Sequence, residues 1–231
     1  MIAEAALEII PIELTKHKSI LNHAKKLNRS PSEIFLDTSY HHAAMLNSNL
    51  KYWWKRGRPD IIHFDLLEAN STPLFLKGKL SIYVSTIDNK LLILKKNLRL
   101  PKSYVRFEGL MRNIYGNRNN SKSHSLIELR DDIEFDYLIK KIIRPDVVIG
   151  LSTKGKFRKL ADLISGHVVD QSNHYCFVVG GFQKGSFSEK TTSTFDYLYR
   201  INNYHLESHV VISRLIYECE NLPINVSPHP P

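Results

Sequence analysis

The residues best suited to chemistry in this sequence are basic and aromatic side chains, which gather in two clusters. The first cluster runs from Lys51 to Asp60 and contains four cations and both tryptophans, with Asp60 as its only acid. Aromatic rings can stack on unpaired bases while guanidinium groups bind phosphate, as single-stranded RNA recognition requires. The tryptophans could equally be core or dimer contacts, so this cluster leaves both interpretations open.

The second cluster lies between Lys95 and Arg106 and contains five cations with no acid among them. Lys102 and Arg106 are four residues apart, so on a helix they are neighbours on one face. Several positive groups near the start of a helix repel one another unless an anion lies across them. This spacing therefore favours a phosphate-binding role over a merely solvated face.

A third segment, from Gly150 to Phe157, is similar to a phosphate-binding loop. That pattern requires Ser or Thr after Lys156 to bind Mg²⁺, and Phe157 stands there instead. The pair His205 and His209 has a metal-like spacing but no third ligand nearby in the sequence. We therefore expect no metal site, and we keep the glycine-bounded segment as a candidate loop for another ligand.

Composition limits the class of protein. The 231 residues include 32 Lys and Arg against 23 Asp and Glu, which gives a net charge of +9 and favours a polyanionic partner. With 42% hydrophobic and 24% charged residues the chain can bury a core, so disorder throughout is excluded. No stretch has the roughly 18–20 apolar residues of a membrane helix, and the start has no basic signal region. Two cysteines form no disulfide framework, which suggests a reducing compartment, the cytoplasm.

Apolar runs of strand length alternate with helical patterns, which predicts an α/β layer architecture with strands buried on both faces. Two β-rich runs around Asp88 and Asn89 predict a hairpin within an inserted extension, at about 71–100. Pro101 is expected to open a helix that Gly116 closes, and Asp37 to cap another near Tyr40. The last helix should cover about Leu206 to Glu220, followed by a free tail at 223–231. The expected strands are Ile61–Leu67, Leu80–Thr86, Lys90–Lys95, Leu126–Leu129, Asp146–Leu151, Tyr175–Val179 and Tyr197–Ile201.

Five blocks in this order resemble the ribosome-biogenesis pseudouridine methyltransferases of the SPOUT class, over nearly the whole chain. The compact start is more similar to archaeal than to eukaryotic members. The blocks are Leu36-Asp-Thr-Ser-Tyr-His-His42, Gly57-Arg-Pro-Asp60 with Ile-Ile-His63, Arg99-Leu-Pro-Lys102 with Arg106-Phe-Glu-Gly-Leu-Met111, Phe177-Val-Val-Gly180-Gly-Phe-Gln-Lys-Gly185 and Ile201-Asn-Asn-Tyr204.

The resemblance implies a single domain over 1–231, built on a mostly parallel sheet with helices on both faces and a C-terminal trefoil knot. It implies a homodimer that binds S-adenosylmethionine without a metal and methylates N1 of a pseudouridine in small-subunit rRNA. Two alternatives stay open: an rRNA-binding assembly factor without catalysis, and a SPOUT methyltransferase that acts on tRNA.

The resemblance also assigns roles to residues. Asp60 is the candidate catalytic residue, which would help deprotonate N1; the alternative is that it only orients Arg58 through a salt bridge. The RNA-facing residues are Arg58, Asp60, Arg99, Lys102 and Arg106. The cofactor-binding residues are Thr153, Gly180, Gly185, Ile201, Asn202, Asn203, Tyr204, His205 and Leu206, so the segment that begins at Gly150 becomes the first cofactor loop. Glycines at 180, 181 and 185 would let the main chain approach a flat adenosine.

Overall fold

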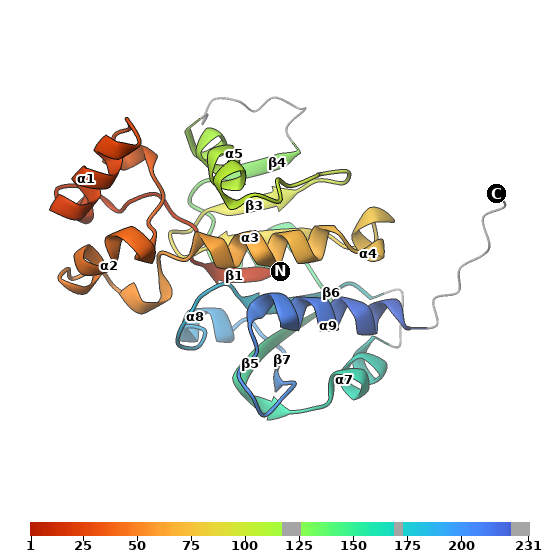
Figure 1. Ribbon diagram of the computed structural model, residues 1–231. Coiled ribbons are helices and arrows are strands. Elements are labelled where there is room, and N and C mark those ends of the chain that lie inside the picture. Colours follow the sequence, from red (N-terminus) through yellow and green to blue (C-terminus); the bar gives the residue numbers. More distant parts are fainter. Residues whose placement is uncertain (117–125, 169–172, 223–231) are drawn as a thin grey trace.

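The computed structural model describes residues 1–116, 126–168 and 173–222, and Figure 1 shows their arrangement. Seven strands form one sheet in the order β4-β3-β2-β1-β6-β5-β7. The strands are β1 (Ile2–Ala5), β2 (Ile82–Thr86), β3 (Leu91–Leu94), β4 (Ile127–Arg130), β5 (Val147–Phe157), β6 (Tyr175–Gly180) and β7 (Tyr197–Arg200). The α-helices are α1 (Lys18–Lys26), α2 (Thr38–Leu46), α3 (Pro59–Asn70), α4 (Pro73–Leu76), α5 (Tyr104–Gly116), α6 (Phe135–Tyr137), α7 (Leu160–His167), α8 (Glu189–Thr192) and α9 (Ser208–Glu220). Short helical turns η1 (Ile12–Leu14), η2 (Pro31–Glu33) and η3 (Trp53–Lys55) and a π-helix η4 (Leu138–Ile143) complete the described elements.

The sheet is mostly parallel, as predicted. Strand β1 pairs in parallel with β2 and β6, and β5 pairs in parallel with β6 and β7. The predicted hairpin also forms, because β2 and β3 pair antiparallel from Ile82↔Leu94 to Ser85↔Leu91. Strand β2 lies next to β1, so the hairpin strands continue the main sheet toward β4.

Side chains on both faces of the sheet are buried. In β6, Val179 packs with α3 and α9, whereas its neighbour Val178 packs with residues of α6 and η4. The same alternation holds in β3, where Leu92 and Leu91 belong to the two opposite clusters. Because successive strand residues point to opposite faces, helices on both faces explain why these strands read as continuous apolar runs.

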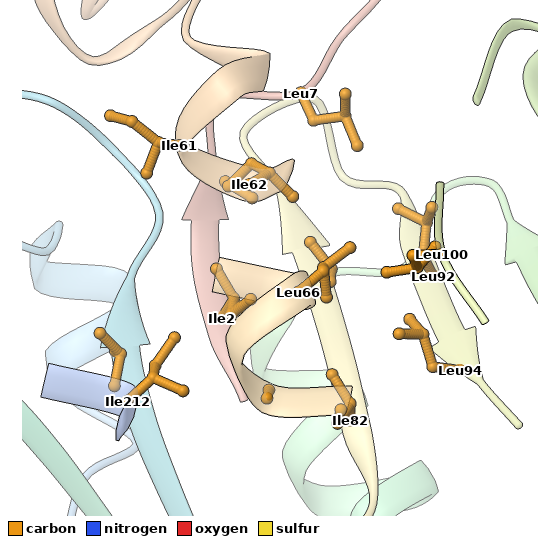
Figure 2. Packing of buried hydrophobic residues seen from close by; sticks show 14 of the residues in the cluster. Ile2, Leu7, Ile61, Ile62, Leu66, Ile82, Leu92, Leu94, Leu100 and Ile212 are labelled. Carbon is orange, nitrogen blue, oxygen red and sulfur yellow. The ribbon is translucent and has the colours of Figure 1, made fainter. Parts of the chain in front are cut away.

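The expected strand Ile61–Leu67 is wrong, because these residues lie in α3. Pro59 occupies the first turn of this helix, where its missing N–H is not needed. Figure 2 shows Ile62 and Leu66 on α3 packed over the strands that carry Ile2 and Ile82. The helix is buried on more than one side, so apolar residues follow one another in its sequence and do not show the spacing of three to four residues that predicts a helix.

Several further features test the sequence predictions. Helix α5 begins at Tyr104, so Pro101 lies before the helix and does not open it; the helix is described as far as Gly116, and the residues that follow lie outside the described part of the chain. The segment from Gly150 to Phe157 is not a loop but the second part of β5, with an irregular register to β7. The side chain of Asp37 caps α2, and α9 forms at the predicted place. The predicted tail at 223–231 lies outside the described residues.

At Gly155, β5 lies close to the backbone of β7. A Cβ atom built on Gly155 would lie 2.5–2.6 Å from the backbone C, Cα and N of Tyr199. Because those neighbours are main-chain atoms of a paired strand, no rotamer change can relieve the overlap. Glycine is therefore required there to keep the two strands in register.

We predict that Gly155→Ala destabilises the protein by about 1–3 kcal/mol, the usual cost of overpacking. Gly109→Ala is the matched control, since a Cβ on Gly109 in α5 meets nothing within 4 Å. Removing a glycine from a helix interior should stabilise by up to about 1 kcal/mol. Chemical denaturation of both variants measures the difference, and equal stability of Gly155→Ala and wild type would contradict the close approach.

Candidate functional site

A pocket opens at the carboxyl ends of β5, β6 and β7. Its lining includes Leu151 and Val179, where the pairing of β5 with β6 ends, and Arg200 at the end of β7, and Ile61 of α3 contributes another side. In α/β sheets, ligands bind in crevices outside the carboxyl ends of parallel strands. The pocket is therefore the first place to expect a ligand in this fold.

Eight of the nine predicted cofactor residues line this pocket, although they come from three separate parts of the sequence. Thr153 follows the regular part of β5, Gly180 ends β6, and the segment after β7 supplies most of the rest. The eight are Thr153, Gly180, Gly185, Ile201, Asn202, Tyr204, His205 and Leu206; Asn203 is exposed and does not line it. The fold thus gathers these residues, which places the predicted set in one cavity.

The three glycines at 180, 181 and 185 lie in different surroundings. A Cβ on Gly180 would meet the Phe182 ring at 2.7 Å, and Phe182 itself lines the pocket. A Cβ on Gly181 would meet Ile2, Ile62 and the backbone of Ala5, so this glycine serves the core and not the pocket. Gly185 has φ +100°, a conformation that side chains disfavour.

The carboxylate of Glu4 in β1 binds the loop between β6 and α8. Its Oε1 accepts a hydrogen bond from the Ser188 N–H at 2.7 Å, and its Oε2 accepts one from Lys55 Nζ at 2.5 Å. Burial alone would raise the pKa of Glu4, but the hydrogen bonds from Lys55 and Ser188 outweigh it and lower the pKa. The ionised carboxylate therefore links this pocket wall to β1 and η3.

Arg58 and Asp60 form a two-point ion pair beside the pocket. Arg58 Nε donates to Asp60 Oδ1 at 2.8 Å, and Arg58 Nη2 donates to Oδ2 at 2.7 Å. The hydrogen bond with Asp60 raises the pKa of the Arg58 guanidinium, and the charge of Glu207 on the pocket lining raises it further. Asp60 precedes Ile61, so the ion pair lies next to the pocket wall.

Contacts between α3 and the start of α5 bring the second basic cluster to this region. The His63 ring stacks on Phe107 with 4.4 Å between centroids, and its Nε2 lies 2.8 Å from the carbonyl oxygen of Pro101. Lys102 follows directly. Burial raises the pKa of Tyr104 in the next turn, and the charges of Asp37 and Asp60 add to this shift.

The two basic clusters differ in how their charges are used. In the first, Lys55 pairs with Glu4 and Arg56 with Glu8, so much of its charge is neutralised inside the protein. In the second, Arg99, Lys102 and Arg106 are exposed, and none of them forms an ion pair within the described residues. The second cluster therefore keeps exposed positive charge, unpaired among the described residues, just before and at the start of α5.

The two tryptophans of the first cluster lie in different surroundings. Trp53 is half-buried and packs against the small core formed by α1 and α2, as its core interpretation predicts. Trp54 is 42% exposed and lies near Gly185 on the pocket loop. Within residues 1–116, 126–168 and 173–222, no group of three metal-ligating side chains gathers, and no helix has the length and apolarity to cross a membrane.

Comparison with known proteins identifies the family of the chain. The profile of the EMG1/NEP1 methyltransferase family matches residues 1–220. The chain belongs to the EMG1/NEP1 methyltransferase family. It is 34% identical over 224 residues to the ribosomal RNA small subunit methyltransferase Nep1 of Staphylothermus marinus, covering 96% of this chain and 94% of the relative. It is 37% identical over 194 residues to the Nep1 of Thermococcus sibiricus, covering 81% and 82%.

The fold has a counterpart among solved members of the EMG1/NEP1 family. The crystal structure of Archaeoglobus fulgidus Nep1 bound to S-adenosylhomocysteine superposes with a TM-score of 0.79 at 29% identity. The match covers 95% of each chain. The likeness therefore extends over the whole sheet and its helices.

Sequence analysis missed several residues that line the pocket. Ile61 was missed because its segment was assigned to a strand, and a proline followed by an acid at a helix start was the available signal. Phe182, Gln183, Ser186 and Phe187 lie between or beside the predicted glycines, so loop continuity would have indicated them. No sequence pattern indicated that Glu4 supports the loop between β6 and α8, because its partners Lys55 and Ser188 are 51 and 184 residues away in the sequence.

We predict that Gly180→Val weakens binding of S-adenosylhomocysteine by at least about tenfold, because the added side chain displaces Phe182 into the pocket. Gly116→Val is the control, since a Cβ there meets nothing within 4 Å. Calorimetry measures both affinities. Unchanged affinity in Gly180→Val would remove Gly180 from the binding site.

Proposed function

We propose that this chain transfers a methyl group from S-adenosylmethionine to N1 of a pseudouridine in small-subunit rRNA. The observation that carries the proposal is the position of one pocket, with eight predicted cofactor residues in its lining, directly beside the Arg58–Asp60 ion pair. Family membership supports rRNA methylation, and the S-adenosylhomocysteine complex of a solved relative supports the cofactor.

The pocket residues fit this cofactor chemically. Ile61, Leu151, Val179 and Val211 offer apolar contacts for a flat purine, and the segment after β7 offers backbone groups for its polar edge. The exposed carboxylate of Glu207 lies on the same lining and would interact with a cationic ligand. When bound, the cofactor supplies an activated methyl group on a sulfonium. Methyl transfer then depends mainly on how the protein positions the acceptor base.

RNA would reach the pocket across the start of α5. Arg99, Lys102 and Arg106 are exposed and, in the described part of the chain, have no acidic partner, so they are available to phosphates. Lys102 keeps its positive charge but lacks the two-point geometry of an arginine. Arg58 would bind the ribose or phosphate of the nucleotide whose base enters the pocket.

Asp60 would act on the acceptor base in one of two ways. Both of its oxygens accept hydrogen bonds from Arg58 in this structure, which favours orientation of the guanidinium as its first role. A direct role in deprotonating N1 requires one oxygen to leave Arg58 when the RNA binds. The two roles make different predictions for catalysis.

We also propose a homodimer in which cations of both subunits contribute to the RNA groove. Individual exposed rings on the edge strand β7 (Tyr197), α9 (Tyr217), α3 (Phe64) and the segment after β7 (Tyr204) are candidates for such a contact. Light scattering at micromolar concentration should give twice the chain mass. A monomer with intact methylation would contradict the dimer.

The other predictions from the sequence remain proposals of the same kind. They are a single domain, a C-terminal trefoil knot, an inserted extension at about 71–100 that carries the β2–β3 hairpin, and a cytoplasmic location. The position of β7 beside β5, with β6 on the other side of β5, supports a crossing in the C-terminal part. An experimental density map in which 201–207 threads no loop would contradict the knot, and cell fractionation tests the location.

The test of the function is methylation of small-subunit rRNA with isotope-labelled S-adenosylmethionine, followed by mass spectrometry of the nucleosides. We expect the label on N1 of pseudouridine and none when uridine replaces it. Binding without label would indicate a non-catalytic assembly factor. Label on tRNA but not on rRNA would indicate the other alternative.

We predict that Asp60→Asn lowers the single-turnover methylation rate by on the order of 10²–10⁴ if the carboxylate moves or orients a proton, while RNA affinity stays or rises. Arg106→Ala is the comparison, since loss of one phosphate contact should weaken RNA binding and make the salt slope shallower by roughly one unit. Both are measured at one pH and salt. A wild-type rate in Asp60→Asn on fully bound RNA would leave Asp60 only as the partner of Arg58.

A further inference from the structure

Asp65 on α3 is the most deeply buried carboxyl group near the pocket. Its residue is 0% exposed, and its Oδ1 accepts a hydrogen bond from the Ser208 hydroxyl at 2.6 Å. Its Oδ2 is also buried and, in the described residues, has no hydrogen-bond partner. Burial raises the pKa of Asp65 to about 7, the Ser208 hydrogen bond opposes this shift, and the charge of Glu207 adds to it.

This arrangement is unfavourable for stability on its own. A buried carboxyl group with one hydrogen bond loses more hydration than it regains, and an apolar side chain would fill the same place at lower cost. The neighbours on the same helix, Ile62 and Leu66, show that this part of α3 is otherwise apolar core. The carboxyl group therefore needs an explanation other than packing.

Ser208 provides that explanation through its position in the chain. It is the first residue of α9, it lines the pocket, and it directly follows the pocket residues Leu206 and Glu207. Glu207 occupies the cap position of α9, but its side chain makes no capping hydrogen bond. Local capping thus does not fix the start of this helix, whereas the Ser208–Asp65 contact joins it to α3.

We infer that Asp65 is a positioning residue that, through Ser208, fixes the end of the 201–207 segment against α3 in the geometry that binds S-adenosylmethionine. The inference rests on the proposed role of the pocket and deepens it. Helix α3 then serves both substrates: its first turn carries Asp60 beside the RNA-facing cations, and its second turn supports the cofactor segment.

The test is a double-mutant cycle on S-adenosylhomocysteine affinity, measured by calorimetry on the full chain. Asp65→Ala and Ser208→Ala should each raise the Kd by roughly three- to tenfold, the effect of one hydrogen bond. The double variant should be no weaker than the weaker single variant, because both changes remove one contact. Asp65→Asn keeps the acceptor oxygen, so it should bind within about twofold of wild type.

Glu220→Ala is the matched control at the other end of α9. Glu220 Oε1 accepts a hydrogen bond from the Leu74 N–H at 3.0 Å, so this variant also loosens α9 but far from the pocket. It should lower the melting temperature and leave the Kd unchanged. In steady-state methylation, Ser208→Ala should raise the KM for the cofactor while kcat at saturation stays close to wild type.

Three results would overturn the inference. One is unchanged affinity in both Asp65→Ala and Ser208→Ala when the wild type binds, which would leave the proposed function intact. The second is a Kd change in Glu220→Ala as large as that in Ser208→Ala, which would mean general loosening of α9. The third is failure of the wild type itself to bind S-adenosylhomocysteine, which would remove the proposed function as well.

Discussion

Parallel pairing of β5, β6 and β7 is the constraint on which the rest of the site depends. The register places Leu151 of β5 opposite Val179 of β6 and Tyr199 of β7. The residues at and after these three positions therefore lie at the same edge of the sheet. Residues separated by about fifty positions in the sequence then line one pocket. This register requires Gly155, since any side chain there would overlap the backbone of Tyr199. A glycine that is not itself in the pocket lining is therefore a condition for the binding site.

Helix α3 links the pocket to the cations that we propose to face RNA. Its first turn carries Asp60 in the ion pair with Arg58, Ile61 enters the pocket lining, and His63 contacts the segment before α5. The helix packs on the sheet through residues such as Ile62 and Leu66 (Figure 2). Methyl transfer requires the donor and acceptor to be fixed relative to each other to within a fraction of an ångström. A single buried helix in contact with both sites satisfies this requirement better than two separate loops.

The sequence predicted most of the sheet, because apolar runs such as Tyr175–Val179 have the length of strands buried on both faces. It failed at Ile61–Leu67, where a helix buried on several sides has the same apolar run as a strand. The site residues came from a family resemblance, and spacing alone would not have joined Thr153 to Gly185 and Tyr204. The Glu4–Lys55 and Asp65–Ser208 contacts had no sequence signal at all, since each joins residues brought together only by the tertiary fold.

The distribution of charge separates structural cations from those that face solvent. Lys55 and Arg56 each pair with a glutamate of the first strand or the residues after it, and these pairs fix η3 against β1. These pairs neutralise the charges of Lys55 and Arg56, although both residues belong to the first basic cluster of the sequence. Arg99, Lys102 and Arg106 have no acidic partner in the described residues, and exposed unpaired cations contribute most to the field that attracts a polyanion. Each buried pair contributes no net charge, so the surplus of +9 comes from charges outside these pairs, and Arg99, Lys102 and Arg106 are among the exposed cations that contribute to it.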